Sequence, residues 1–172
     1  MKYHWIYLEK APKLLLVSRS LIGVSEYIGN KNNPTILEWA REVGLSGYYT
    51  NDDIPWCGLF IAYCCHKANL PICKQPLWAR NWATWGNAAT LPMLGDILVF
   101  GRKGGGHVGI YIGEDSSCYH VLGGNQNNQV NIARILKGRL IAARRTPWRI
   151  AQPTTVRRVL LSPSGRVSVN EA

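Results

Sequence analysis

One cysteine and one histidine stand in local contexts that favour covalent chemistry. Cys57 follows Pro55 and Trp56 at the expected start of a helix, where the helix dipole and unpaired backbone N–H groups favour the thiolate. His107 follows the glycines of residues 104–106, which open an expected strand. A histidine beside a cysteine can accept the thiol proton and later protonate a leaving amine. The two residues therefore predict nucleophilic attack on an acyl carbon.

An imidazole in this role needs a third group that holds its tautomer. Two candidates follow His107 in the chain: His120 on the next expected strand, and Asn125 in the Gly-Gly-Asn-Gln stretch of residues 123–126. Either can accept a hydrogen bond from the ring nitrogen that faces away from sulfur. The backbone N–H of Cys57 is the expected donor to the oxyanion, because amides at a helix start point at developing negative charge.

The other four cysteines, at positions 64, 65, 73 and 118, lack a proline-led helix start. We interpret them as small core residues. An odd total of five without CxxC pairs argues against a disulfide framework. A zinc site built from Cys64, Cys65, His66 and Cys73 is disfavoured, because adjacent helical residues point in different directions. We therefore expect no metal and no cofactor.

The composition predicts one globular domain with a strongly basic surface. Of the 172 residues, 47% are hydrophobic and 17% are charged, which is typical of a folded chain. No apolar run reaches the roughly 18 residues of a membrane span, and the N-terminus lacks the pattern of a secretory signal. The net charge of +10 implies an acidic partner surface. Much of the excess lies from Arg134 onward, where nine basic residues accompany a single acid, Glu171.

The first half of the chain has helical patterns. Apolar spacing predicts helices over residues 11–25, 34–43 and 56–68, and a short one over 79–85. Asn33 is the expected N-cap of the second helix, with Pro34 in its first turn. The third helix places Cys57 at its N-terminus.

After Pro92 the pattern changes to short β-rich stretches separated by turn residues. We expect strands over residues 97–100, 107–112, 119–122, 130–132 and 140–143. Helices followed by an antiparallel sheet make an α+β domain over residues 1–150. Residues 151–172 then form a basic, extended C-terminal tail.

Several segments taken together resemble a known family. Residues 51–58 (NDDIPWCG), 95–97 (GDI), 106–115 (GHVGIYIGED) and 122–126 (LGGNQ) are similar to the phage-type cysteine hydrolases of the cell wall, the CHAP and NlpC-like enzymes of the papain-like superfamily. The resemblance covers about residues 11–147. It implies a papain-like α+β fold, with the nucleophile at a helix N-terminus packed on an antiparallel sheet.

The resemblance also implies roles for individual residues. Cys57 corresponds to the nucleophile and His107 to the base. CHAP-like enzymes place an acid or Asn well after the histidine, which matches Asn125, whereas NlpC-type enzymes place a His on the adjoining strand, which matches His120. We favour Asn125, and His120 remains the alternative.

The implied substrate is peptidoglycan, cleaved at the muramoyl–L-alanine amide or within a peptide. Trp56, Trp78, Trp82 and Trp85 either line a substrate groove or belong to the core, and the core interpretation is the simpler one for most. We expect a monomer that contacts anionic wall or outer-membrane groups through its basic surface. An endolysin of this kind accumulates in the host cytoplasm until the membrane opens.

Two alternatives differ in biology or in class. The first is a secreted antibacterial effector with the same chemistry. The second is a non-catalytic basic protein that binds nucleic acid, with Cys57 merely buried. The charge fits the second alternative, but the sequence contains no helix-turn-helix, zinc-finger or RNA-binding strand motif, so we expect no nucleic-acid partner.

Overall fold

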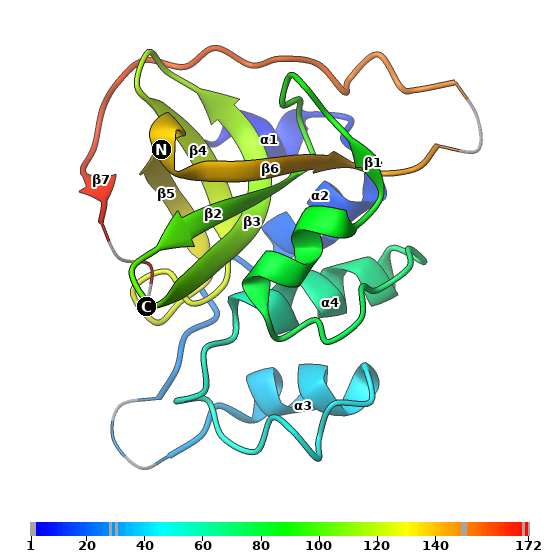
Figure 1. The fold of residues 1–172 in the computed structure, drawn as a ribbon, viewed down its shortest axis with the longest axis vertical. Helices are drawn as coiled ribbons and strands as arrows, with labels where there is room; N and C mark the ends of the chain where they lie inside the picture. Colours follow the sequence, from blue (N-terminus) through cyan, green and yellow to red (C-terminus); the bar gives the residue numbers. More distant parts are fainter. Residues whose placement is uncertain (1–2, 28, 30, 149–150, 170, 172) are drawn as a thin grey trace.

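The computed structural model describes residues 3–27, 29, 31–148, 151–169 and 171. It is an α+β fold in which helices from the first half of the chain pack on a seven-stranded sheet from the second half (Figure 1). The predicted fold class is confirmed at this level. Within the described part of the chain, none of the helices combines the length and apolar character needed to cross a membrane.

The helices agree with the predicted positions but are shorter. The N-cap prediction for the second predicted helix is confirmed, because the Asn33 side chain accepts a hydrogen bond from the Thr35 N–H. The first predicted helix ends earlier than expected, since Ser25 forms a β-bridge with Gln129. The helices are α1 (Trp5–Leu8), α2 (Lys13–Ser20), α3 (Pro34–Glu42), α4 (Cys57–Lys67) and the 3-10 helices η1 (Ala79–Thr84) and η2 (Lys137–Arg139).

The strands form one sheet in the order β1-β6-β2-β3-β4-β5-β7. All neighbouring strands are antiparallel except β5 and β7, which run parallel. All five predicted strands are present, and β1 and β7 are two-residue strands that the sequence pattern did not predict. The strands are β1 (Asn87–Ala88), β2 (Ile97–Arg102), β3 (Gly105–Glu114), β4 (Cys118–Gly123), β5 (Asn131–Leu136), β6 (Leu140–Arg145) and β7 (Val167–Ser168).

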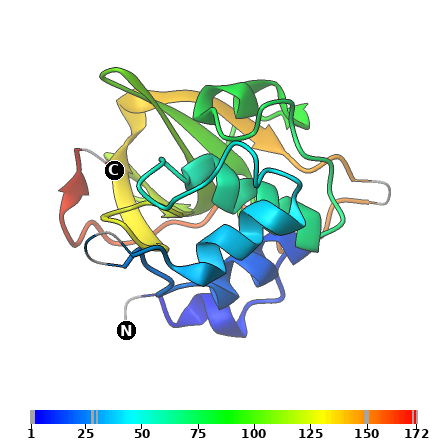
Figure 2. The ribbon, with the colours of Figure 1, turned by 90° about the horizontal axis from the view of Figure 1, so that it is seen from below.

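Helix α4 packs against β3 of the sheet and also against the helices α2 and α3 (Figure 2), while η1 packs on β2, β3 and β6. Alternate residues of β3, including Val108 and Ile110, join the main core on the helix side of the sheet. Tyr111 instead joins a smaller cluster with Phe100 and Val121. Successive residues of a strand have their side chains on opposite faces of the sheet. The side chain of His107 is therefore directed to the sheet face opposite that of Val108.

The segment predicted as the C-terminal tail is extended and lies along the sheet (Figure 1). Backbone bonds join Glu114 to Val159 and Leu161, and β7 then pairs with β5. Arg158 pairs with the Glu114 carboxylate. Part of the positive charge of this segment is therefore neutralised within the fold. Arg149, another of its basic residues, lies outside the described residues.

Candidate active site

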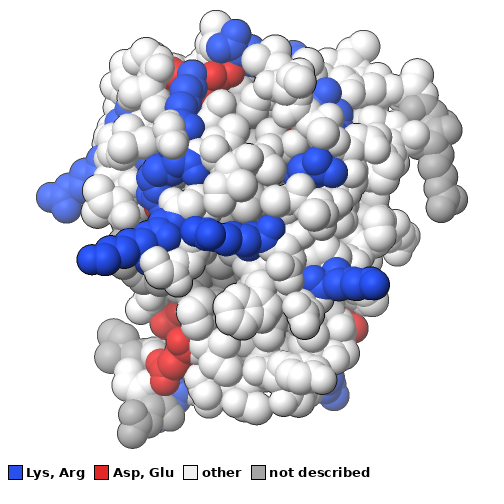
Figure 3. Space-filling model, in the orientation of Figure 1, with Lys and Arg blue, Asp and Glu red and all other residues white. Residues whose placement is uncertain are grey.

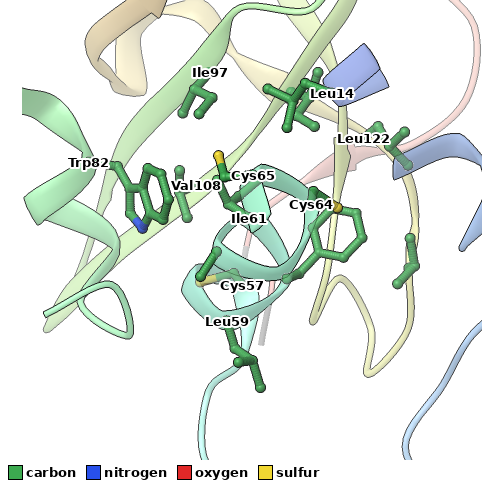
Figure 4. Packing of buried hydrophobic residues seen from close by; sticks show 14 of the residues in the cluster. Leu14, Cys57, Leu59, Ile61, Cys64, Cys65, Trp82, Ile97, Val108 and Leu122 are labelled. Carbon is green, nitrogen blue, oxygen red and sulfur yellow. The ribbon is translucent and has the colours of Figure 1, made fainter. Parts of the chain in front are cut away.

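Cys57 begins helix α4 and is 5% exposed. The next residue must be glycine because the backbone of Pro76 passes very close to Gly58. A Cβ at Gly58 would lie 2.2 Å from the Pro76 carbonyl oxygen, which is closer than real Cβ contacts. The glycine lets the first turn of α4 pack directly on the 76–77 backbone. Figure 4 shows Cys57 in this first turn, whereas Cys64 and Cys65 lie further along the helix in the core.

Backbone N–H groups surround the sulfur of Cys57. Burial raises the pKa of this thiol, while the N–H of Val108, the charge of Arg102 and the N–H groups of Gly58 and of Cys57 itself oppose that rise. The net pKa is above the ordinary value. The sequence predicted that the helix start would favour the thiolate, but the loss of hydration outweighs the favourable amides. The unliganded site therefore holds a neutral thiol at neutral pH.

His107 is 1% exposed near the start of β3. Burial lowers its pKa to about 4, although the buried Glu171 carboxylate and the hydrogen bond to Gln126 act in the opposite direction. Glu171 is itself held by Arg139 through two contacts of 2.8 and 2.7 Å. The imidazole is therefore neutral at pH 7 and has the protonation state that a general base requires.

Gln126 sets the tautomer of that imidazole. Its Oε1 lies 3.0 Å from Nε2 of His107. Its amide nitrogen donates to the carbonyl oxygens of Val121 and Asn131, at 3.2 and 2.7 Å, and to Asn131 Oδ1 at 3.0 Å. Because these partners are acceptors, the amide oxygen must face the histidine. Nε2 then carries the proton and Nδ1 keeps a free lone pair.

Cys57 on α4 and His107 on β3 come from two elements that pack together, but no hydrogen bond joins these two described side chains. The Cys57 sulfur contacts the backbone of Val108, the residue directly after His107. Among the described residues, Nδ1 of His107 has no hydrogen-bond partner. Catalytic hydrogen bonds are often long in unliganded enzymes and tighten when substrate binds. The link between the two side chains in this structure is the backbone of β3, where the residue that contacts the sulfur directly follows His107.

Asn125, the favoured third residue, has a different position from the one predicted. With its amide oriented to satisfy its surroundings, it donates to Glu26 Oε1 at 3.2 Å and accepts from the Trp56 N–H at 3.3 Å. Glu26 also accepts from Trp56 Nε1 at 2.5 Å. Asn125 has a positive φ of 55°, which turns its side chain to the start of α4. It supports the helix that bears Cys57, and Gln126 takes the contact with His107.

His120, the alternative third residue, belongs to a separate buried cluster. Its Nδ1 lies 2.7 Å from the Tyr3 hydroxyl and its Nε2 lies 2.8 Å from Asp115 Oδ2. Arg134 donates to the same carboxylate oxygen at 2.8 Å. Burial alone would raise the pKa of Asp115, but hydrogen bonds from Arg134, Ser117 and His120 outweigh it and lower the pKa. Both ring nitrogens of His120 thus have partners other than His107.

A groove of about 770 Å³ opens beside Cys57. Of the four tryptophans named above, only Trp78 lines it, and that side chain is 69% exposed. Trp56, Trp82 and Trp85 are buried, which confirms the core interpretation for most of the four. The groove is lined by Leu45, Tyr48, Ile54, Pro55, Cys57, Gln75, Pro76, Leu77, Trp78, Ala79, Arg102 and residues 104–106.

Sequence reasoning missed two residues of this site, Gln126 and Arg102. Gln126 directly follows Asn125, the residue favoured from the sequence as the partner of His107. The glycine pair at residues 123–124 was the sequence signal that could have indicated Gln126. A Cβ on Gly124 would lie 2.6 Å from Phe60 Cβ, so this turn must pass tightly against α4. Such a turn leaves Asn125 facing the helix and the next residue facing the strand. Arg102 ends the strand before the glycine turn, a position that brings it opposite Gly105.

The described residues contain no group of three or more His, Cys, Asp or Glu side chains placed to hold a metal ion. All five cysteines are free thiols. No family model, no curated protein and no solved structure matches this chain.

Proposed function

We propose that this chain is a papain-like cysteine hydrolase that cleaves an amide bond of bacterial peptidoglycan. The observation that carries the proposal is the position of Cys57. Its sulfur lies at a helix N-terminus against the N–H of Val108, the residue that follows His107 in β3, and Gln126 fixes the tautomer of that histidine. The resemblance of the sequence to CHAP and NlpC-like enzymes supports the substrate. The groove beside Cys57 supports a peptide-sized ligand.

The chemistry begins with a neutral pair. As the substrate carbonyl approaches, the Cys57 thiol transfers its proton to Nδ1 of His107 and the sulfur attacks the carbonyl carbon. The imidazolium that forms is stabilised by the hydrogen bond from Nε2 to Gln126 and by the nearby Glu171 carboxylate. Both contacts are needed because burial disfavours the charged imidazolium, which is also why the imidazole is neutral before the reaction.

The tetrahedral intermediate carries its negative charge on the former carbonyl oxygen. The N–H groups of Cys57 and Gly58 at the start of α4 are the proposed donors to this oxygen. Collapse of the intermediate breaks the C–N bond, and the leaving amine takes the proton from Nδ1. Water then attacks the thioester on Cys57, with His107 as base, and releases the carboxylic acid and the free thiol.

Mass spectrometry of fragments released from purified peptidoglycan tests this function. We expect soluble fragments from the wild type and none above background from Cys57→Ala. A muramoyl–L-alanine amidase frees the lactyl carboxyl of muramic acid and the amine of the first residue, whereas an endopeptidase frees ends within the peptides. Absence of release from walls of several bacterial types contradicts the proposal.

A further inference from the structure

Two exposed aromatic rings line the groove beside Cys57. Tyr48 is 77% exposed and Trp78 is 69% exposed, and of the exposed large hydrophobic residues in the described part of the chain, only these two line the groove. Tyr48 belongs to the segment before α4 and Trp78 to the segment before η1. Single exposed aromatic residues are common on protein surfaces, but two that line one groove beside a proposed nucleophile indicate a binding surface.

Hydrogen bonds fix the turns that carry both rings. The Tyr48 N–H donates to the Leu45 carbonyl oxygen at 2.9 Å. The Trp78 N–H donates to the Gln75 carbonyl oxygen at 3.1 Å, and the Asn81 side chain also donates to that oxygen, at 3.2 Å. Each ring is thus presented by a hydrogen-bonded turn. A surface that is ordered before binding loses little conformational entropy when a ligand binds.

The other walls of the groove are mostly uncharged. None of the described residues that line it is acidic, and Arg102, its charged residue, already has a partner within the chain. On the face drawn in Figure 3, Lys and Arg side chains gather over the β2–β3 hairpin and η1, and uncharged side chains cover most of the area below them. An ammonium group on a ligand would find no carboxylate among the lining residues, and its burial there would be costly. The groove therefore favours a ligand whose bound part is uncharged.

The faces of the two aromatic rings select the shape of that ligand. The face of an aromatic ring is electrically negative, so it attracts C–H groups that carry a small positive charge. A pyranose sugar presents such C–H groups on the faces of its ring, while its hydroxyl and acetamido groups point outward from the rim and stay in water. The peptides of peptidoglycan, in contrast, carry ionised carboxyl and amino groups. The sugar beside the amide therefore matches this groove better than the peptide does.

We infer that the groove binds a pyranose sugar ring against Tyr48 and Trp78, and that the amide cleaved at Cys57 joins the lactyl group of this sugar to the first amino acid. The inference rests on the proposed function, and it adds which side of the amide the groove recognises. Addition of water across this amide gives a glycan with a free lactyl carboxyl group and a peptide with a free amino end. Tyr48 and Trp78 are accordingly specificity-determining residues.

Binding of tri-N-acetylchitotriose, an uncharged sugar without a peptide, tests the groove without any hydrolysis. Its Kd is measured by NMR from the shifts of the backbone amides of residues 104–106, which line the groove. Tyr48→Ala and Trp78→Ala should each raise this Kd by about three- to tenfold, because each removes one ring face. Tyr48→Phe keeps the ring face and should give a Kd within about twofold of the wild type.

Tyr27→Ala is the matched control, because Tyr27 is 50% exposed but does not line the groove. Its Kd should stay near that of the wild type. The inference is overturned by a lack of saturable sugar binding, by an unchanged Kd in either Tyr48→Ala or Trp78→Ala, or by equal weakening in Tyr27→Ala. A Kd for Tyr48→Phe as weak as that of Tyr48→Ala also overturns it.

The products of peptidoglycan digestion separate this inference from the proposed function. Free lactyl carboxyl groups on the released glycan are the expected result. Cleavage only within the peptides overturns the inference and leaves the proposed hydrolase standing. Intact peptidoglycan, together with sugar binding that depends on both rings, counts against the proposed function alone.

Discussion

Replacing Gln126 by leucine tests which residue of the turn holds His107. The leucine has a similar size but no acceptor for Nε2 of His107, which now lies 3.0 Å from Oε1. A hydrogen bond to a charged group contributes about 1.5–3 kcal/mol. Since that bond matters when the imidazolium forms, kcat/KM should fall by about 10- to 150-fold, mainly in kcat. The carbonyl oxygens of Val121 and Asn131 also lose a donor, which should lower the free energy of unfolding by about 1–3 kcal/mol.

The control is Asn125→Gly. Glycine adopts the positive φ of 55° at this position without strain, so the change removes only the side-chain bonds to Glu26 and Trp56. We expect a loss of stability of about 1 kcal/mol and a kcat/KM within about threefold of the wild type. Both variants are assayed for hydrolysis and for urea unfolding. Wild-type kcat in Gln126→Leu together with a large loss in Asn125→Gly would refute the reasoning and restore Asn125 as the third residue.

Three further predictions concern pH, the buried cluster and the groove. The pKa of His107 is about 4 in the fold and about 6.5 when unfolded, so the unfolded chain binds a proton first as pH falls. Stability should therefore decrease between pH 6.5 and 4 by up to about 3 kcal/mol, and urea titrations of His107→Gln should show a shallower decrease. Asp115→Asn leaves Arg134 without its buried counter-charge and should cost about 3–5 kcal/mol of unfolding free energy; an unchanged melting temperature contradicts this. Trp78→Ala removes an exposed ring of the groove and should raise KM by up to about tenfold with little change in kcat, and an unaltered KM argues against a binding role.

The sequence predicted the elements whose signals are local. The Asn33 cap, the apolar spacing of α4 and the glycine turn before β3 each depend on a few neighbouring residues, and the structure contains all three features. The short strands β1 and β7 were missed because a two-residue strand is too short to show an alternation of apolar and polar residues. They are defined only by their pairing, β1 with β6 and β7 with β5. The helix predicted over residues 11–25 ends at Ser20. Its predicted end was wrong because Ser25 pairs with Gln129, a residue far along the chain that local spacing does not reveal.

The candidate site shows the same limit at the level of single side chains. Position within a strand and at a helix start made Cys57 and His107 candidates, because those contexts are local, and the structure has Cys57 at the start of α4 and His107 in β3. The contact of Gln126 with His107, in place of the predicted contact of Asn125, depends on a turn with positive φ and on where α4 packs against it. The protonation state of Cys57 was misjudged for a related reason. Burial raises its pKa by more than the backbone amides lower it, and burial follows only from the assembled fold.

The most direct test compares the rates of fragment release from peptidoglycan for the wild type, Cys57→Ala and Cys65→Ala. Both cysteines are buried on α4, so the second variant controls for the loss of a buried thiol. We predict that Cys57→Ala loses at least about a thousandfold in rate while remaining folded. Cys65→Ala should stay near the wild-type rate. A folded Cys57→Ala that releases fragments at the wild-type rate contradicts the account.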